Sequence, residues 1–240
     1  MIICGKNSVA EALASDKSIE KLFVLKGHLD NSIQRILDGA RENNVKILFV
    51  TKDKLNELTT DKHQNVVAEI SDFGYSEVSD ILALAKSKNE PVFILILDGI
   101  EDPHNLGSII RTAEVAGVHG IIIPKNRAVG VNDTVIRTSS GAIHHMKIAK
   151  VTNINNTIRE LKDNFVNIVG TDGKGEAMYN SHLTGDIAVI IGSEGNGIKP
   201  STLNLCDNVI AIPMYGKVNS LNASVACGII VYEVVRQKTK

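Results

Sequence analysis

The sequence is poor in cysteine and has no long apolar run. Its three cysteines, Cys4, Cys206 and Cys227, are scattered and odd in number, so they suggest neither a disulfide framework nor a zinc site. No apolar run approaches the roughly 18 residues of a membrane span. The first residues, "MIICGKNSVAEALAS", lack the basic and then apolar pattern of a signal peptide. We therefore expect a cytoplasmic protein that spans no membrane and binds no metal.

A surplus of charge of either sign is also lacking. The formal net charge is -1, and acidic and basic residues are mixed along the chain without a basic tail. A general electrostatic attraction to nucleic acid is therefore not indicated. If the substrate is RNA or DNA, the positive surface must be local or shared across an oligomer.

The chain reads as two α/β domains. Residues 1–72 alternate amphipathic segments such as "NSIQRILDGARENN" with short apolar runs such as "IEKLFV". Residues 73–90 are more polar, contain Gly74 and predict a linker with a short helix over 79–86. From residue 91 to 240, apolar runs such as "VFILILDG" and "DIAVIIG" alternate with helical segments. This alternation predicts a mostly parallel sheet covered on both faces.

Ligands bind beyond the carboxyl ends of strands in such a sheet, and the first polar cluster there is "LDGIEDPHNLGSIIRTAEVAG". A strand ends near Leu97, and a helix begins near Asn105. Asn105 and Arg111 are six residues apart, so they do not share one helical face, although both could border one cleft. Equally, Asn105 could cap the helix while Gly107 permits close packing and Arg111 is solvated or pairs with Glu114.

The second cluster is the glycine-rich segment "IIGSEGNGIKP". It is not a Walker A motif, because Ile198 stands where the lysine must be. It is not a dinucleotide motif either, because Pro200 takes the place of the third glycine. It is a ligand loop of another kind or a tight turn, and Glu194 within it favours the ligand loop.

The third cluster, "NSLNAS", opens the apolar C-terminal helix. Asn219 or Ser220 is the expected N-cap, which leaves Asn222 and Ser224 to be explained. A weaker cluster, "PKNRAVGVNDTVIRTSSGAIHH", indicates either a local basic surface for a phosphate backbone or a solvated face.

Together, "DPHNLGSIIRTAEVAG", "IIGSEGNGI" and "IPMYGKVNSLNASVACGIIVYE" resemble the three signature motifs of the TrmH-like (SpoU) ribose 2′-O-methyltransferases in the SPOUT superfamily. The segments "GKNSVAEAL" and "HQNVVAEI" resemble the ribosomal-protein-like RNA-binding domain of the enzyme that methylates a guanosine ribose in 23S ribosomal RNA. Asn65 departs from that pattern, because relatives usually carry glycine there.

The resemblance implies an S-adenosylmethionine-dependent homodimer whose C-terminal domain contains a deep trefoil knot. It implies that the cofactor is held, largely by backbone groups, at Gly192, Ile212, Leu221 and Thr171. It assigns Arg111 to activation of the ribose hydroxyl. The other catalytic-site residues that it implies are Asn105, Glu194, Ser220 and Asn222.

Arginine is a poor base, since its pKa lies above about 12. We therefore expect Arg111 to act together with a neighbouring RNA phosphate. The expected substrate is 23S ribosomal RNA, and a transfer RNA ribose methyltransferase is the closest alternative. A catalytically silent RNA-binding factor is a further alternative. The C-terminal helix is apolar around most of its circumference, so it needs cover on more than one side, and a second subunit could supply it.

Overall fold

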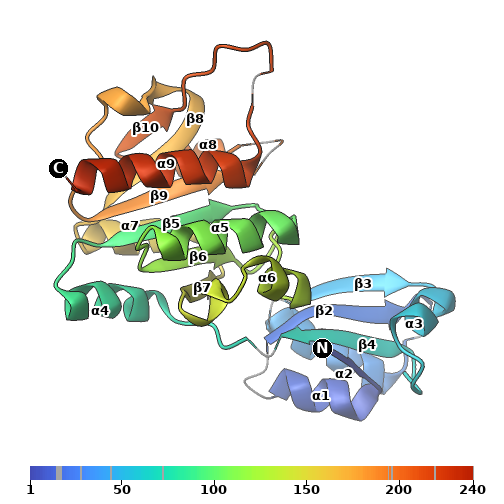
Figure 1. The fold of residues 1–240 in the computed structure, drawn as a ribbon. Helices are drawn as coiled ribbons and strands as arrows, with labels where there is room; N and C mark the ends of the chain where they lie inside the picture. The colour runs from blue at the N-terminus through green and yellow to red at the C-terminus, as the bar shows by residue number, and fades with distance from the viewer. Residues whose placement is uncertain are drawn as a thin grey trace. The chain divides into compact units, whose positions relative to one another are not determined.

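The computed structural model of the chain consists of two compact units, Met1–Gly74 and Tyr75–Lys240, both drawn in Figure 1. The structure describes residues 1–14, 18–27, 29–43, 45–71, 73–193, 195, 197–218 and 220–239. None of the helices in these ranges is long and apolar enough to cross a membrane.

The N-terminal unit is a four-stranded mixed sheet in the order β1-β4-β2-β3. Strand β4 pairs antiparallel with β1 and β2, and β2 pairs parallel with β3. Its elements are β1 (Ile2–Cys4), α1 (Lys6–Ala14), β2 (Ser18–Leu25), α2 (Asn31–Glu42), β3 (Lys46–Val50), α3 (Lys52–Leu58) and β4 (Val66–Ser71).

Each face of this small sheet has its own hydrophobic cluster. Leu22 and Val24 on β2 pack with residues of α1 and α2, whereas Phe23 between them packs with Leu55 of α3. The two-residue period of a strand therefore sends alternate side chains to helices on opposite faces. Strand β1 was not expected from the sequence, since three residues carry too little pattern to identify a strand.

Asn65 occupies a backbone conformation that explains the glycine usual at this position. Its φ is +69°, in the left-handed region where glycine is favoured and asparagine is tolerated. His63, two residues earlier, is buried, and its Nδ1 accepts a hydrogen bond from the Asn65 N–H at 3.0 Å. The turn therefore keeps its shape with asparagine in place of glycine.

The C-terminal unit contains a six-stranded, entirely parallel sheet in the order β10-β8-β9-β5-β6-β7. Its strands are β5 (Phe93–Asp98), β6 (Gly120–Pro124), β7 (Lys147–Val151), β8 (Asn167–Ala177), β9 (Ile187–Gly192) and β10 (Asn208–Ala211). Its α-helices are α4 (Val78–Lys88), α5 (Pro103–Val115), α6 (Asp133–Thr138), α7 (Ile154–Asp163), α8 (Pro200–Leu203) and α9 (Ala223–Lys238).

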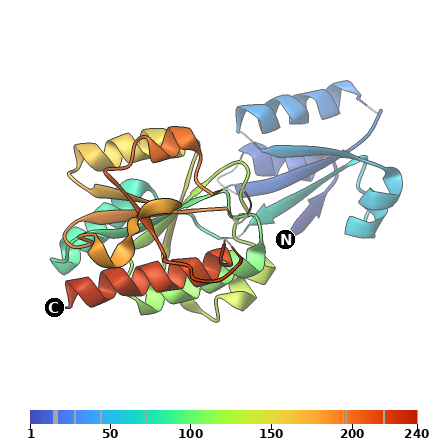
Figure 2. The ribbon, with the colours of Figure 1, turned by 90° about the horizontal axis from the view of Figure 1, so that it is seen from above.

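Helices cover both faces of this sheet, as Figure 2 shows from above. Helices α5 and α9 lie side by side on one face, while α4, α7 and α8 lie on the other. All six residues of β5 are buried, which is the expected consequence of cover on both sides. The apolar runs of the sequence therefore correspond to the central strands.

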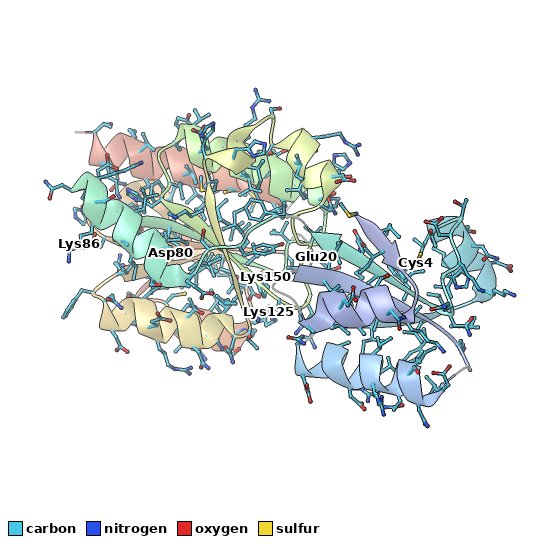
Figure 3. The ribbon with its side chains drawn as sticks, turned by 90° about the horizontal axis from the view of Figure 1, so that it is seen from below. Cys4, Glu20, Asp80, Lys86, Lys125 and Lys150 are labelled. Carbon is cyan, nitrogen blue, oxygen red and sulfur yellow. The ribbon has the colours of Figure 1, made fainter. Side chains whose placement is uncertain are left out.

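Residues 73–90, expected to be a linker, lie largely within the second unit. Val78, Ile81 and Ala85 of α4 are buried, and the first two belong to the core cluster on the α7 face of the sheet. Asp80 and Lys86 are labelled on the same helix in Figure 3 and are exposed. The amphipathic helix is thus an integral layer of the C-terminal unit.

Candidate functional site

The carboxyl ends of the parallel strands bring distant polar residues to one edge of the sheet. Strands β5 and β9 are neighbours, and their last residues, Asp98 and Gly192, lie opposite each other in the register. The first and second polar clusters of the sequence therefore begin side by side. This is the edge at which open parallel sheets bind ligands.

A pocket of about 350 Å³ opens at this edge, and we call it the Asn105 pocket. Its lining comes from the segment after β5, the start of α5 and the segment after β9. The lining residues are Gly99, Ile100, Glu101, Asp102, Asn105, Ser193 and Gly195. Ser193, Gly99 and Ile100 were not singled out from the sequence, because nothing in their local pattern separates them from ordinary loop residues.

Asn105 is fixed in the first turn of α5. Asp102 is the N-cap of this helix, accepting a hydrogen bond from the His104 N–H at 2.9 Å, and Pro103 follows it at the start of the helix. Asn105 is therefore not the cap, and its side chain is 6% exposed at the pocket. Gly107 allows α6 to approach, since a Cβ at this position would lie 2.6 Å from Cβ of Thr138.

Asn222 connects the third cluster to this pocket. Its Nδ2 donates a hydrogen bond to Oδ1 of Asn105 at 3.0 Å, across 117 residues of sequence. Its Oδ1 accepts from the backbone N–H groups of Ser224 and Val225 at 2.9 and 3.3 Å, so Asn222 is the N-cap of α9. One side chain thus both caps the helix and holds a buried asparagine of α5.

The expected N-cap at Ser220 is wrong, because α9 begins three residues later at Ala223. Ser220 is exposed and precedes the cap by two residues. The other expected cap, Asn219, lies outside the described residues. A cap must accept from the first free N–H groups of the helix, and only Asn222 stands at the correct distance along the chain.

Gly192 lies where two backbone segments almost touch. A Cβ at this position would be 2.3 Å from the carbonyl carbon of Gly197 and 2.5 Å from the nitrogen of Ile198. The loop closes through the Gly197 N–H, which donates to the Ser193 carbonyl at 2.9 Å. Only glycine fits here without displacing the backbone. Glu194, a predicted catalytic residue in this loop, lies outside the described residues.

Arg111 lies away from the Asn105 pocket. It is exposed on α5, and its Nη1 is 3.5 Å from Oγ of Ser140. Six residues of helix separate it from Asn105, a rise of about 9 Å along the axis. Within one chain, Arg111 does not line the pocket.

The residues expected to hold a cofactor lie on different elements of the C-terminal unit. The Thr171 hydroxyl on β8 donates to the Ile190 carbonyl of β9 at 2.8 Å, so this side chain joins two strands near the glycine-rich loop. Ile212 is half-buried just after β10, and Leu221 is 38% exposed beside Asn222. Both stand in the long segment that connects β10 to α9.

Asp98, Arg127 and Lys199 form a charged group at the same edge. Asp98 is 3% exposed, and its Oδ1 lies 3.3 Å from Nζ of Lys199. Arg127, Asp98 and Lys199 line one pocket, which is separate from the Asn105 pocket. Lys125 and Lys150, labelled in Figure 3, lie close together at the ends of β6 and β7.

Cys227 is buried, and Cys206 is half-buried. Burial raises the pKa of Cys227 to about 12 and that of Cys206 to about 11, so both remain thiols at neutral pH. Among the described residues, no group of three or more His, Cys, Asp or Glu side chains is arranged to hold a metal ion.

Family comparisons divide the chain at nearly the same place as the structure. Residues 92–232 match the SpoU rRNA methylase family, and residues 2–76 match the family described as RNA 2′-O ribose methyltransferase substrate binding. YacO of Bacillus subtilis, assigned to the TrmH family of tRNA/rRNA methyltransferases, is 44% identical over 98% of this chain and 95% of its own length. A TrmH family relative in Staphylococcus aureus is 42% identical over 99% of this chain and 96% of its own length.

Solved structures share the arrangement of the fold. An AdoMet-bound rRNA methyltransferase from Sinorhizobium meliloti has a TM-score of 0.62 and 25% identity, covering 98% of this chain and 86% of its own. The SpoU methyltransferase AviRb from Streptomyces viridochromogenes has a TM-score of 0.63, covering 99% and 90%, and at 24% identity it shows the fold alone. With both units matched and close relatives over its full length, the chain belongs to the SpoU/TrmH family of RNA methyltransferases.

Proposed function

We propose that this protein transfers a methyl group from S-adenosylmethionine to the 2′-oxygen of a ribose, and that this ribose belongs to a guanosine in 23S ribosomal RNA. The observation that carries the proposal is the hydrogen bond from Asn222 to Asn105 at 3.0 Å, which joins the third motif to the first at the Asn105 pocket. This bond unites two separate polar clusters at the edge of the sheet where ligands bind.

We propose that the segment around Gly192 binds the adenosine of the cofactor, a flat and largely uncharged group. The close approach of the Gly197 and Ile198 backbone to Gly192 fixes the main chain at the end of β9, and main-chain groups there would recognise the adenosine without charged side chains. We assign Gly192, Ile212, Leu221 and Thr171 to cofactor binding. The AdoMet-bound structure from Sinorhizobium meliloti supports S-adenosylmethionine as the cofactor. When bound, the cofactor supplies an electrophilic methyl group, so the chain must align the ribose oxygen and help remove its proton.

We assign Arg111 to this proton step together with an RNA phosphate. The guanidinium remains positively charged, so it cannot accept the proton at neutral pH. Its charge instead holds a phosphate and lowers the cost of the negative charge that develops on the ribose oxygen. The exposure of Arg111 leaves it accessible to a substrate. Glu194, Ser220 and Asn222 complete the proposed site with Asn105.

Ribosomal RNA is preferred over transfer RNA as the substrate, and we place the reaction in the cytoplasm. The preference rests on the N-terminal unit, which matches the substrate-binding family over residues 2–76. The TrmH/SpoU tRNA-modifying enzyme of A. aeolicus covers 66% of this chain, with 28% identity and a TM-score of 0.57. An additional RNA-binding unit suits a substrate that must be recognised within a large folded RNA.

We also propose a homodimer formed through α5 and α9. Three apolar side chains of α9 are spaced so that they lie on one exposed side: Val225 is 50% exposed, Ile229 36% and Tyr232 49%. Val115 on the adjacent α5 is 66% exposed and follows Arg111 by one turn. A second copy packed here would cover these side chains and bring Arg111 to the interface.

Light scattering tests the dimer with Tyr232→Glu, which places a charge in the proposed interface. The matched control is Tyr179→Glu, because Tyr179 is 59% exposed on a different element, Met178–Asn180. We expect Tyr232→Glu to be monomeric and Tyr179→Glu to keep the mass of the wild type. A monomeric wild-type protein at micromolar concentration would contradict the proposal.

Mapping of 2′-O-methyl groups in cellular RNA tests the function. Cells that lack the gene should lose one such group in 23S ribosomal RNA, and a plasmid copy should restore it. A copy with Arg111→Ala should not restore it, although the variant should still bind S-adenosylmethionine. Loss of a methyl group from transfer RNA would favour the alternative substrate. An unchanged map in both RNA classes would favour a catalytically silent RNA-binding factor.

A further inference from the structure

A second pocket, of about 250 Å³, opens at the carboxyl edge of the C-terminal sheet, and we call it the Lys199 pocket. It is bordered by the end of β5, the segment after β6, the start of α7 and the start of α8. The lining residues with polar or charged side chains include Asp98, Asn126, Arg127, Asn153, Asn155 and Lys199. None of these residues belongs to the three motifs that carry the proposed methyl transfer, although Asp98 lies four residues before the first motif and Lys199 directly follows the second.

The Lys199 pocket lies next to the Asn105 pocket. Asp98 lines the former and the following residue, Gly99, lines the latter. A Cβ at Gly99 would lie 3.5 Å from Cβ of Ser193 and 3.7 Å from the Arg127 carbonyl oxygen, so this glycine stands between the two linings. One ligand that extends past Gly99 can therefore reach both pockets.

The loop that carries Arg127 is held in place. The Val129 N–H donates to the carbonyl of Ile100, a residue of the Asn105 pocket, at 2.9 Å. Arg127 itself has a φ of +58°, in the left-handed region that costs a non-glycine residue free energy. Such conformations persist only where the surrounding structure imposes them, and they are frequent at ligand sites. The position of Arg127 is therefore fixed by the fold.

The asparagines of the Lys199 pocket present hydrogen-bond donors. Oδ1 of Asn153 accepts from the Asn156 N–H at 3.2 Å, and Oδ1 of Asn155 accepts from the Thr202 hydroxyl at 2.8 Å. Both amide oxygens are thus engaged within the protein, which leaves the NH₂ groups as the available part of each side chain. Neither NH₂ group donates to another residue in the part of the chain that the structure describes.

The charged residues make the pocket positive. Among the lining residues that the structure describes, Asp98 is the one acidic side chain beside Arg127 and Lys199, and it lies 3.3 Å from Lys199. The Lys199 side chain is still 55% exposed, so it can reach a ligand while it neutralises the buried carboxylate. Arg127 forms no ion pair with any residue of the described ranges. A ligand with only acceptor atoms and a negative charge matches this set of donors.

We propose that the Lys199 pocket binds a phosphodiester group of the RNA strand whose ribose occupies the Asn105 pocket. This inference rests on the proposed function, and it names the part of the substrate that the neighbouring pocket holds. A phosphodiester group has only acceptor oxygens, and its negative charge complements the positive charges of Arg127 and Lys199. Phosphate contacts fix the register of a strand without reading its sequence. The pocket therefore positions the ribose for transfer.

The test compares Arg127→Ala with Lys86→Ala in RNA binding without cofactor. Lys86 is exposed on α4, well away from Lys125 at the end of β6 in Figure 3. Lys86→Ala therefore also removes one positive charge from the C-terminal unit, but at a different place. We expect Arg127→Ala to weaken binding of a short unmodified RNA hairpin about tenfold, as for loss of a charge-assisted hydrogen bond. Its slope of log affinity against log salt should fall by about 1. Lys86→Ala should match the wild type.

Equal affinities and salt slopes for Arg127→Ala and Lys86→Ala would overturn the proposal. Because removal of Lys199 alone would leave Asp98 buried and unpaired, its contribution is tested in the double variant Asp98→Asn, Lys199→Gln. This variant should also bind RNA more weakly than the wild type and retain the native circular dichroism spectrum. Native folding with unchanged RNA affinity would count against a phosphate at this position.

The cofactor also carries an anionic carboxylate, so it is the other possible ligand of the Lys199 pocket. Calorimetry with S-adenosylmethionine distinguishes the cofactor from the RNA phosphate. We expect Arg127→Ala to bind the cofactor as tightly as the wild type. Weaker cofactor binding with unchanged RNA binding would assign the pocket to the cofactor and overturn the inference. The binding measurements need no methyl transfer. A protein that binds RNA through Arg127 but never methylates it would refute the proposed function and leave the phosphate contact standing.

Discussion

The two units of the chain contain sheets of different kinds, and only one sheet gathers its strand ends at a single edge. In the N-terminal unit, β4 runs antiparallel to both of its neighbours, so the loops divide between the two ends of the sheet. In the C-terminal unit, all six strands are parallel, and both polar pockets open at their carboxyl ends. Both units alternate strands and helices, but only the parallel sheet collects the loops after its strands at one edge.

Both units nevertheless contain a helix that is capped by a polar side chain at its N-terminus. Asp30 caps α2 by accepting from the Ser32 and Ile33 N–H groups, both at 3.0 Å, as Asn222 caps α9. The cap of α2 contacts Lys6 at the surface, whereas the cap of α9 contacts a buried residue of another helix. Topology, rather than local chemistry, gives the second cap its additional role.

The largest effect is expected where the parallel sheet brings two backbone segments together. Gly192→Ala places a Cβ within 2.5 Å of backbone atoms that cannot rotate away, so the C-terminal unit should lose about 3 kcal/mol of unfolding free energy. Urea unfolding measures this loss, and calorimetry should show loss of cofactor binding. The matched control is Gly195→Ala, since no other described residue beyond its chain neighbours has an atom within 4 Å of that added Cβ. Equal stabilities of the two variants would contradict the close approach.

A smaller effect is expected from removal of the two caps. Asn222→Ala should lower the unfolding free energy by about 1 kcal/mol, as for other N-caps. It should also lower kcat about 100-fold, because Asn105 loses the donor that orients it. Asp30→Ala should destabilise the N-terminal unit without changing kcat. Equal methyl-transfer rates for Asn222→Ala and Asp30→Ala would show that the α9 cap has only a structural role.

The smallest expected effect is a pH dependence of stability that arises in the C-terminal unit. Burial lowers the pKa of His119 in the C-terminal unit, while the nearby Glu90 partly opposes this shift. Its Nδ1 accepts from the Phe93 N–H at 3.1 Å, which requires the neutral ring. A histidine whose folded pKa is lowered stabilises the fold fully above its unfolded pKa of about 6.5. That stability is lost as pH falls from about 6.5 towards the folded pKa.

Urea unfolding at pH 7.5 and 5.5 checks the sign of this effect. The wild type should be less stable at the lower pH, and His119→Asn should lose part of that dependence, because asparagine can accept from Phe93 without titrating. His63→Asn in the N-terminal unit is the control, because its ring nitrogen also accepts a backbone N–H group. A pH dependence of the same size in His119→Asn and the wild type would exclude His119 as its source.

Local pattern predicted most of the C-terminal sheet. Continuous apolar runs identified β5 and β9, because strands covered on both faces bury every residue. Strand β7, "KIAKV", was missed because its lysines interrupt the apolar pattern, although Ile148 and Ala149 are buried. The segment 73–90 appeared to be a linker because α4 has a buried face on one side and charged residues on the other.

The details of the site depend on contacts that no local pattern contains. Asn222 and Asn105 are 117 residues apart, and Asp98 and Lys199 are 101 apart. The motifs indicated which segments matter, but the N-cap was misplaced because Asn219, Ser220 and Asn222 all have side chains that can cap a helix. The residue at which α9 begins determines which of the three is the N-cap, and tertiary packing determines where α9 begins.

Methyl transfer in vitro measures the proposed ribose 2′-O-methylation itself. Purified protein is incubated with labelled S-adenosylmethionine and unmodified 23S ribosomal RNA, and the product is digested to nucleosides. We expect label in a 2′-O-methylated nucleoside with the wild type, strongly reduced label with Arg111→Ala and Asn222→Ala, and little label in transfer RNA. RNA that is bound but never labelled by the wild type, or label found on a base instead of a ribose, would contradict the proposal.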